Sequence, residues 1–202
     1  MSAPQQLPWH ARAALAGCTV LAAMVGVGAT GEIMRLRRLS EIPALFAPNP
    51  LLPPEALAQA EAVARASMFG MRSSRLVVLS LLFIACLVTF LTVLRLWRPL
   101  GLPRGGMLRL ASFAALGCAL LRVVDGAQDA VIFRRFASAL AVAMSSGSTP
   151  ALPDPDVARL ATDLQVALHM GWTLVVASAF LILSQYFRSP KARKLFTAGD
   201  PA

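Results

Sequence analysis

The chain has 202 residues, of which 57% are hydrophobic and only 14% are charged, and its formal net charge is +9. A soluble domain carries about 25% charged residues, so this chain has too little polar surface to cover a water-soluble globule. The arginines form no stripe with interleaved aromatic side chains. We therefore interpret the positive charge as contact with anionic membrane lipid and expect no nucleic-acid partner.

Four apolar runs follow one another along the chain, at 11–30, 76–94, 110–121 and 166–187. A helix needs about 20 mostly apolar residues to cross a hydrocarbon core about 30 Å thick. The first, second and fourth runs have about this length. The run 110–121 is shorter, and it reaches this length only if Arg109 lies at one membrane boundary and Arg122 and Asp125 lie at the other. The sequence therefore predicts an all-α, polytopic membrane protein, a single membrane domain over 1–202 with a four-transmembrane-helix bundle.

The first run also has the features of a signal peptide, with the small residues 27–29 as a cleavage site. The segment before it holds a single basic residue, Arg12. The duplication described next requires the run to stay in the protein, so we expect it to form the first transmembrane helix.

Two parts of the chain resemble each other, 11–98 and 107–188, each with two apolar runs. The correspondences occur in the same order: Gly31 to Arg37-Arg38 with Gly126 to Arg134-Arg135, Pro50-Leu-Leu-Pro53 with Pro150-Ala-Leu-Pro153, Leu76 to Ser80 with Leu174 to Ser178, and Trp97-Arg98-Pro99 with Phe187 to Pro190. The sequence predicts a duplicated helical hairpin. Two spans per copy give both copies the same orientation, so the repeats are parallel.

The two loops that join the spans within each repeat also have helical features. Each contains prolines followed by an acidic residue, Glu55 in the first and Asp156 in the second, which is typical of a helix start. Nothing breaks the helical pattern from Asp156 to Phe187, a length of about 50 Å. We expect short helices in these two outer loops that project from the membrane as a cap.

Basic residues in short segments favour the cytoplasmic side of a membrane. The N-terminus, the 98–106 loop and the basic tail 189–202 share one side, although Arg35, Arg37 and Arg38 follow the first run closely on the other. The first side carries Arg12, Arg95, Arg98, Arg104, Arg109, Arg188, Lys191, Arg193 and Lys194. We predict a multi-pass protein of the cell membrane, a bacterial inner membrane by its arginine and alanine usage, with both termini cytoplasmic and the tail on anionic lipid.

Charged residues cluster near the outer end of the third span. Arg122, Asp125 and Asp129 are spaced to share one helix face, and His169 lies at a comparable depth on the fourth span, where Gln165, His169 and Thr173 form a polar stripe. Two interpretations stand open. The carboxylates and imidazole could handle protons or bind a metal, or Arg122 and Asp125 could form a structural ion pair or gate with His169 as a packing group.

Other motifs add no chemistry. Cys18, Cys86 and Cys118 lie in different apolar runs without a CxxC spacing, so we expect packing roles. His10 and His169 fall at opposite membrane faces, which excludes a bis-histidine haem. The sequence predicts no metal and no cofactor.

Three functions are compatible with this pattern. The leading hypothesis is a non-catalytic accessory, assembly or scaffolding component that contacts membrane lipids and a partner membrane subunit or a second copy of itself. The first alternative is a small transporter or channel whose gate contains Arg122, Asp125 and His169. The second is a membrane-embedded enzyme for a lipid or quinone-like substrate, which would need a cavity bounded by Asp125, Asp129 and His169.

Overall fold

Helices make up most of the computed structural model, which describes residues 7–45, 53–97, 104–146 and 155–197. The helices in these ranges are α1 Trp9–Arg37, α2 Pro54–Trp97, α3 Arg104–Ser146, α4 Pro155–Arg188 and α5 Pro190–Thr197. Prolines begin three of them because a residue in the first helical turn needs no backbone N–H partner. The all-α prediction is confirmed.

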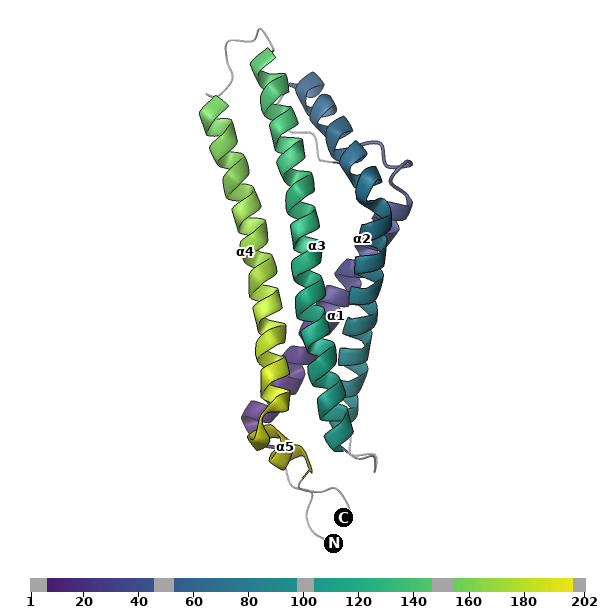
Figure 1. The fold of residues 1–202 in the computed structure, drawn as a ribbon, viewed down its shortest axis with the longest axis vertical. Helices are drawn as coiled ribbons and strands as arrows, with labels where there is room; N and C mark the ends of the chain where they lie inside the picture. Colours follow the sequence, from purple (N-terminus) through teal and green to yellow (C-terminus); the bar gives the residue numbers. More distant parts are fainter. Residues whose placement is uncertain (1–6, 46–52, 98–103, 147–154, 198–202) are drawn as a thin grey trace.

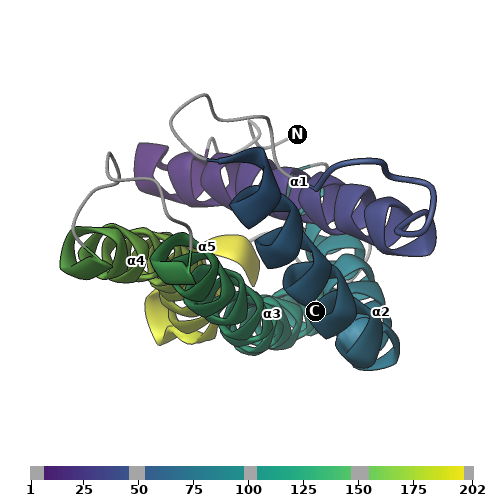
Figure 2. The same ribbon diagram turned by 90° about the horizontal axis from the view of Figure 1, so that it is seen from above.

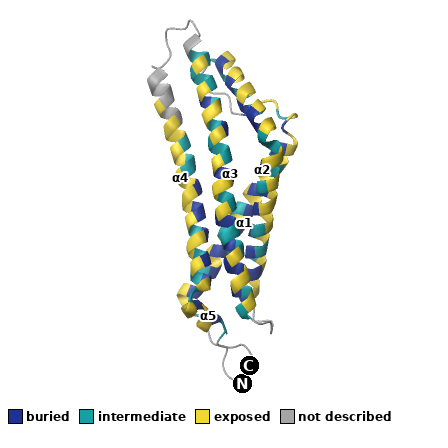
Figure 3. Cartoon of the chain, viewed as in Figure 1, coloured by how far each residue is buried: buried dark blue, intermediate teal, exposed yellow. Residues whose placement is uncertain are grey.

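Four helices are long and apolar enough to cross a membrane, which confirms the four predicted spans. The shortest, α1, has 29 residues, or about 43 Å at 1.5 Å per residue. A third or less of the most apolar stretch of each helix is buried inside the bundle. Figure 3 shows exposed residues along the outer faces and buried ones where helices meet. Such outward-facing apolar surface is expected where lipid is the solvent.

The helices differ in tilt, and this difference positions the site. Figure 1 shows α2, α3 and α4 running roughly side by side, whereas α1 crosses them diagonally. The view along the bundle agrees, because α1 extends sideways along one face of the bundle formed by the other helices (Figure 2). Accordingly, α1 packs mainly against α2 and makes few contacts with α4.

Small side chains and a pair of hydrogen-bonded serines lie at the contacts between helices. The central cluster contains Ala22, Cys86 and Cys118 among other buried residues, and small side chains let helix backbones approach closely. Ser112 on α3 and Ser184 on α4 each donate to the other's carbonyl oxygen, at 3.0 and 2.9 Å. These paired bonds satisfy buried polar groups and hold α3 to α4, and Arg188 Nε also donates to Ser112 Oγ at 2.8 Å.

The outer-loop helices are continuous with the spans. Pro54 begins a single helix of 44 residues that runs through the predicted loop helix into the second span, and α4 does the same from Pro155. Arg65 ties the segment after α1 to this outer part, because it donates to the carbonyl oxygens of Leu39 and Pro43, at 2.9 and 3.4 Å. The proline motifs at 50–52 and 150–153 lie outside the described residues.

The duplication stays a prediction. α1 ends at Arg37, whereas α3 continues past the matching Arg134 and Arg135 to Ser146. The tilt of α1 also has no counterpart in α3 (Figure 1).

The first part of the predicted tail is a docked helix. Ser189 caps α5 by accepting a hydrogen bond from the backbone N–H of Ala192 at 3.1 Å. Ala192 and Phe196 are buried in a cluster with Ala11 of α1 and Leu108 of α3. The start of α1 and helix α5 therefore lie at the same end of the bundle.

Candidate functional site

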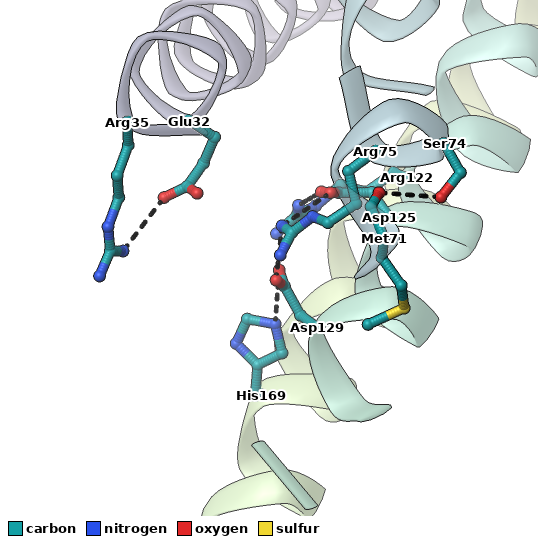
Figure 4. Close-up of polar contacts among 9 residues, drawn as sticks. All are labelled: Glu32, Arg35, Met71, Ser74, Arg75, Arg122, Asp125, Asp129 and His169. Atoms are coloured by element: carbon teal, nitrogen blue, oxygen red, sulfur yellow. Dashed lines mark hydrogen bonds and ion pairs between the residues drawn. The ribbon is translucent and has the colours of Figure 1, made fainter. Parts of the chain in front are cut away.

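An arginine on α2 is the centre of the polar cluster. Arg75 is fully buried, at 0% exposed, and its Nη2 lies 2.6 Å from Asp129 Oδ1 and 3.6 Å from Asp125 Oδ1. Arg122 pairs with the other oxygen of Asp125, one helical turn away on α3. Figure 4 shows the four side chains converging between α2 and α3. The ion pair that joins two helices is therefore made by Arg75, and the Arg122–Asp125 pair lies within α3.

A close helix contact brings α4 to this cluster. A Cβ atom at Gly126 of α3 would overlap the side chain of Thr173 on α4, so only glycine permits this approach. Thr173 is itself fully buried. His169 lies one turn from Thr173 on the same face of α4, and the contact at Gly126 therefore positions its ring beside α3.

His169 faces Asp129. Its Nε2 atom lies 3.5 Å from Asp129 Oδ2, longer than a direct hydrogen bond of 2.7–3.2 Å. The ring also packs on Phe133, with centroids 5.5 Å apart. Nε2 is buried and has no hydrogen-bond partner within the described part of the chain. The imidazole is held by packing, with a nitrogen left available next to a carboxylate.

A cavity of about 330 Å³ adjoins the cluster. Its lining combines a polar end with an apolar body: Glu32, Arg122, Asp125, Asp129 and His169 at the polar end, and Leu21, Met24, Val25, Gly28, Ala29, Leu79, Leu82, Trp172 and Val176 elsewhere. We call this cavity the lateral pocket. It lies where α1 tilts away from α4, so the tilt of α1 creates it.

The lateral pocket opens toward the lipid-facing surface. Met24 of α1 and Trp172 of α4 both line it, yet they are 64% and 60% exposed. Residues that both line a cavity and face outward form its mouth. The mouth therefore lies on the outward-facing surface of the helices. Leu21 and Glu32 are eleven residues apart in the sequence, so the pocket extends about 16 Å along α1.

The charges around the polar end are balanced. Each carboxylate has a guanidinium partner, and the third such pair is Glu32 with Arg35 on α1, at 3.6 Å. Figure 4 shows this pair set apart from the cluster. The six charges are those of Glu32, Asp125, Asp129, Arg35, Arg75 and Arg122. These six charges sum to zero, so the polar end offers hydrogen-bonding groups with little net charge.

The predicted site residues separate into two sets. Arg122, Asp125, Asp129 and His169 line one pocket, whereas Gln165 is exposed on α4. No group of three or more His, Cys, Asp or Glu side chains within the described ranges is placed to hold a metal ion. The carboxylates of Asp125 and Asp129 face guanidinium groups instead.

The sequence pattern does not single out Arg75, because an arginine directly before the apolar run 76–94 is typical of a membrane boundary. Arg75 lies twenty residues before Arg95, and His169 lies nineteen before Arg188. Because each helix rises about 1.5 Å per residue, these nearly equal spacings put both side chains at a similar depth. That comparison between the second and fourth spans, which run in the same direction, was the available signal.

Comparisons with protein-family models, curated proteins and solved structures gave no match for this chain. Its function must therefore be argued from the lateral pocket itself.

Proposed function

We propose that this protein is a non-catalytic accessory component of the membrane that holds one amphiphilic molecule, drawn sideways from the bilayer, in the lateral pocket. The observation that carries the proposal is the division of the pocket lining. One end presents Glu32, Asp129 and His169, and the remainder is apolar and opens outward at Met24 and Trp172. A headgroup would contact the polar end while its tail lies along α1 and α4 or in the lipid.

The ion pairs favour binding over acid–base chemistry. A general base needs a carboxylate or imidazole that can gain and lose a proton at the reacting atom. Here Asp125 and Asp129 are ion-paired with the buried guanidinium of Arg75, which commits one carboxylate oxygen of each side chain to a contact inside the bundle. The same contacts make Arg75 a bridge between α2 and α3. These features suit a fixed framework around a ligand.

The orientation in the membrane is part of the same proposal. Both termini lie in the cytoplasm of a cell-membrane protein, and the lateral pocket faces the outer leaflet. The basic residues of α5 support this arrangement, because Lys191, Arg193 and Lys194 are exposed while Ala192 and Phe196 are buried against the bundle. A basic strip at the bundle end contacts anionic lipid headgroups of the inner leaflet.

The test is co-purification of the native ligand. The protein is extracted with its surrounding lipid in copolymer discs, and the amphiphiles that remain after detergent exchange are identified by mass spectrometry. Gly28 lines the lateral pocket, and a Cβ there meets no atom within 4 Å, so Gly28→Leu would fill the pocket without a backbone clash. Gly17→Leu is the control, because Gly17 is also an exposed glycine of α1 with open space around it.

We expect about one amphiphile per wild-type chain, retained by the Gly17→Leu protein and lost from the Gly28→Leu protein. Both substitutions replace glycine by a better helix former, so neither lowers helix stability. Equal retention by the two variants would refute the proposal, because it would show that the bound lipid lies elsewhere.

A further inference from the structure

Building on the proposed function, we infer that the lateral pocket selects an uncharged headgroup with a hydroxyl or carbonyl oxygen. This is the chemistry of isoprenoid quinones and isoprenoid alcohols. It follows from three properties of the polar end, namely its charge balance, its hydrogen-bonding groups and its size.

The charge balance disfavours ionic headgroups. Three carboxylates line the polar end, and each has at least one guanidinium within 3.6 Å. A phosphate would enter beside Glu32 and Asp129 without an uncommitted arginine to neutralise it. A quaternary ammonium would meet carboxylates that are already neutralised. Because the site lies at membrane depth, where an unpaired charge is costly, both ions are penalised.

The hydrogen-bonding groups suit a neutral oxygen. His169 and Arg122 can donate, and the partly exposed carboxylates of Asp129 and Glu32 can accept. His169 Nε2 is buried with no hydrogen-bond partner within the described ranges, and a buried polar atom left in this state costs free energy. A ligand carbonyl or hydroxyl oxygen beside His169 and Asp129 would give this end of the pocket the polar partner that it lacks.

The size suits a single headgroup. A water molecule occupies about 30 Å³ in the liquid, so a cavity of about 330 Å³ has room for about eleven non-hydrogen atoms. That corresponds to one substituted six-membered ring or the first part of an isoprenoid chain. Trp172 at the mouth offers an aromatic face to a ring. The rest of the tail would leave between α1 and α4 into the bilayer.

The experiment uses the full-length protein in phosphatidylcholine nanodiscs and native mass spectrometry to count adducts. Four probes are titrated separately: a benzoquinone with a decyl chain, farnesol, decyl phosphate and decyltrimethylammonium. We expect one-to-one adducts with one or both uncharged probes, and at least about ten-fold weaker binding of the two charged probes, a difference of about 1.4 kcal/mol. The tighter of the two uncharged probes identifies the source, ring or alcohol.

Two variants locate the binding. His169→Phe removes the donor at the polar end and is expected to weaken the uncharged probes about ten-fold. Leu168→Phe is its control, because Leu168 is the neighbouring residue and is exposed to lipid. Gly28→Leu is expected to abolish the adduct with every probe.

The possible failures are distinct. If decyl phosphate or decyltrimethylammonium binds as tightly as the uncharged probes, and Gly28→Leu abolishes that binding, the headgroup inference is wrong while the pocket function stands. If Gly28→Leu binds all four probes as the wild type does, the proposed function fails as well. Equal loss in His169→Phe and Leu168→Phe would exclude His169 as the donor.

Discussion

Arg75 shows how one side chain can be costly and still indispensable. Taking a guanidinium out of water costs several kcal/mol, and two carboxylates within 3.6 Å offset that cost. The pairing is asymmetric in its consequences. Removing both signs of charge together can be nearly neutral, whereas removing one leaves the other buried and uncompensated.

We therefore expect Arg75→Met to lower the free energy of unfolding by about 3–5 kcal/mol, because Asp125 and Asp129 lose their interhelical partner. Unfolding of the purified protein in mixed micelles by sodium dodecyl sulfate measures this. A double variant that also carries Asp129→Asn should recover most of the loss, because Asp125 keeps Arg122 as its partner. Equal instability of the single and double variants would show that the shape of Arg75 matters more than its charge.

Gly126 is the second residue on which the site depends. A Cβ there would overlap Thr173, so Gly126→Ala forces α3 and α4 apart and should cost about 1–3 kcal/mol. Gly117→Ala on the same helix is the control, because its Cβ would lie 3.9 Å from that of Ala85, an ordinary contact. The same unfolding assay separates them. A Gly126→Ala protein as stable as Gly117→Ala would mean that the approach of α4 is not limited by this contact.

At this scale the sequence revealed part of the candidate site. The spacing of Arg122, Asp125 and Asp129 puts them on one face of α3, and residue counts give His169 its depth. Their partner on α2, Arg75, was missed, because an arginine next to an apolar run can mark the membrane boundary as well as a buried ion pair. Only the three-dimensional packing of α2 on α3 decides between the two.

Among the elements, the spans were predictable because each is long and apolar. Their tilts were not. The composition of α1 sets its length and its small-residue contacts, but its diagonal course depends on how Ala22, Ala29 and their neighbours fit against α2. The lateral pocket depends on the diagonal course of α1 (Figure 1), so no sequence pattern could predict it.

Helix α5 is an element whose docking can be tested alone. Phe196 is fully buried in the cluster at the bundle end, and Arg104 donates to its carbonyl oxygen at 3.1 Å. Phe196→Ala should lower the free energy of unfolding by about 3 kcal/mol through lost burial. Leu195→Ala is the matched control, because Leu195 is 37% exposed and should matter little. If both variants keep wild-type stability, α5 is not packed on the bundle in solution.

The topology of the whole molecule can be tested by cysteine labelling in cells. Cys18, Cys86 and Cys118 are all buried, so the wild type gives a low background with an impermeant maleimide. Ser40 and Lys194 are exposed at opposite ends of the bundle. We expect Ser40→Cys to react in intact cells and Lys194→Cys only after permeabilisation. The reverse pattern would invert the orientation and move the lateral pocket to the inner leaflet.

At the scale of the whole molecule, the central claim is that an amphiphile occupies the lateral pocket, whose mouth lies on the outward-facing surface of the bundle. Trp172 lines that opening, and the chain has three tryptophans. A variant with Trp9→Phe and Trp97→Phe keeps Trp172 as its single tryptophan, so its tryptophan fluorescence reports on the mouth of the pocket.

The most direct measurement is quenching of this single-tryptophan emission in nanodiscs by the decyl-chain benzoquinone. If the pocket binds the probe, quenching saturates with probe concentration, and adding Gly28→Leu reduces it to a shallow, linear dependence from collisions in the bilayer. Linear quenching of equal slope with and without Gly28→Leu would contradict the account, because Trp172 would then report lipid alone.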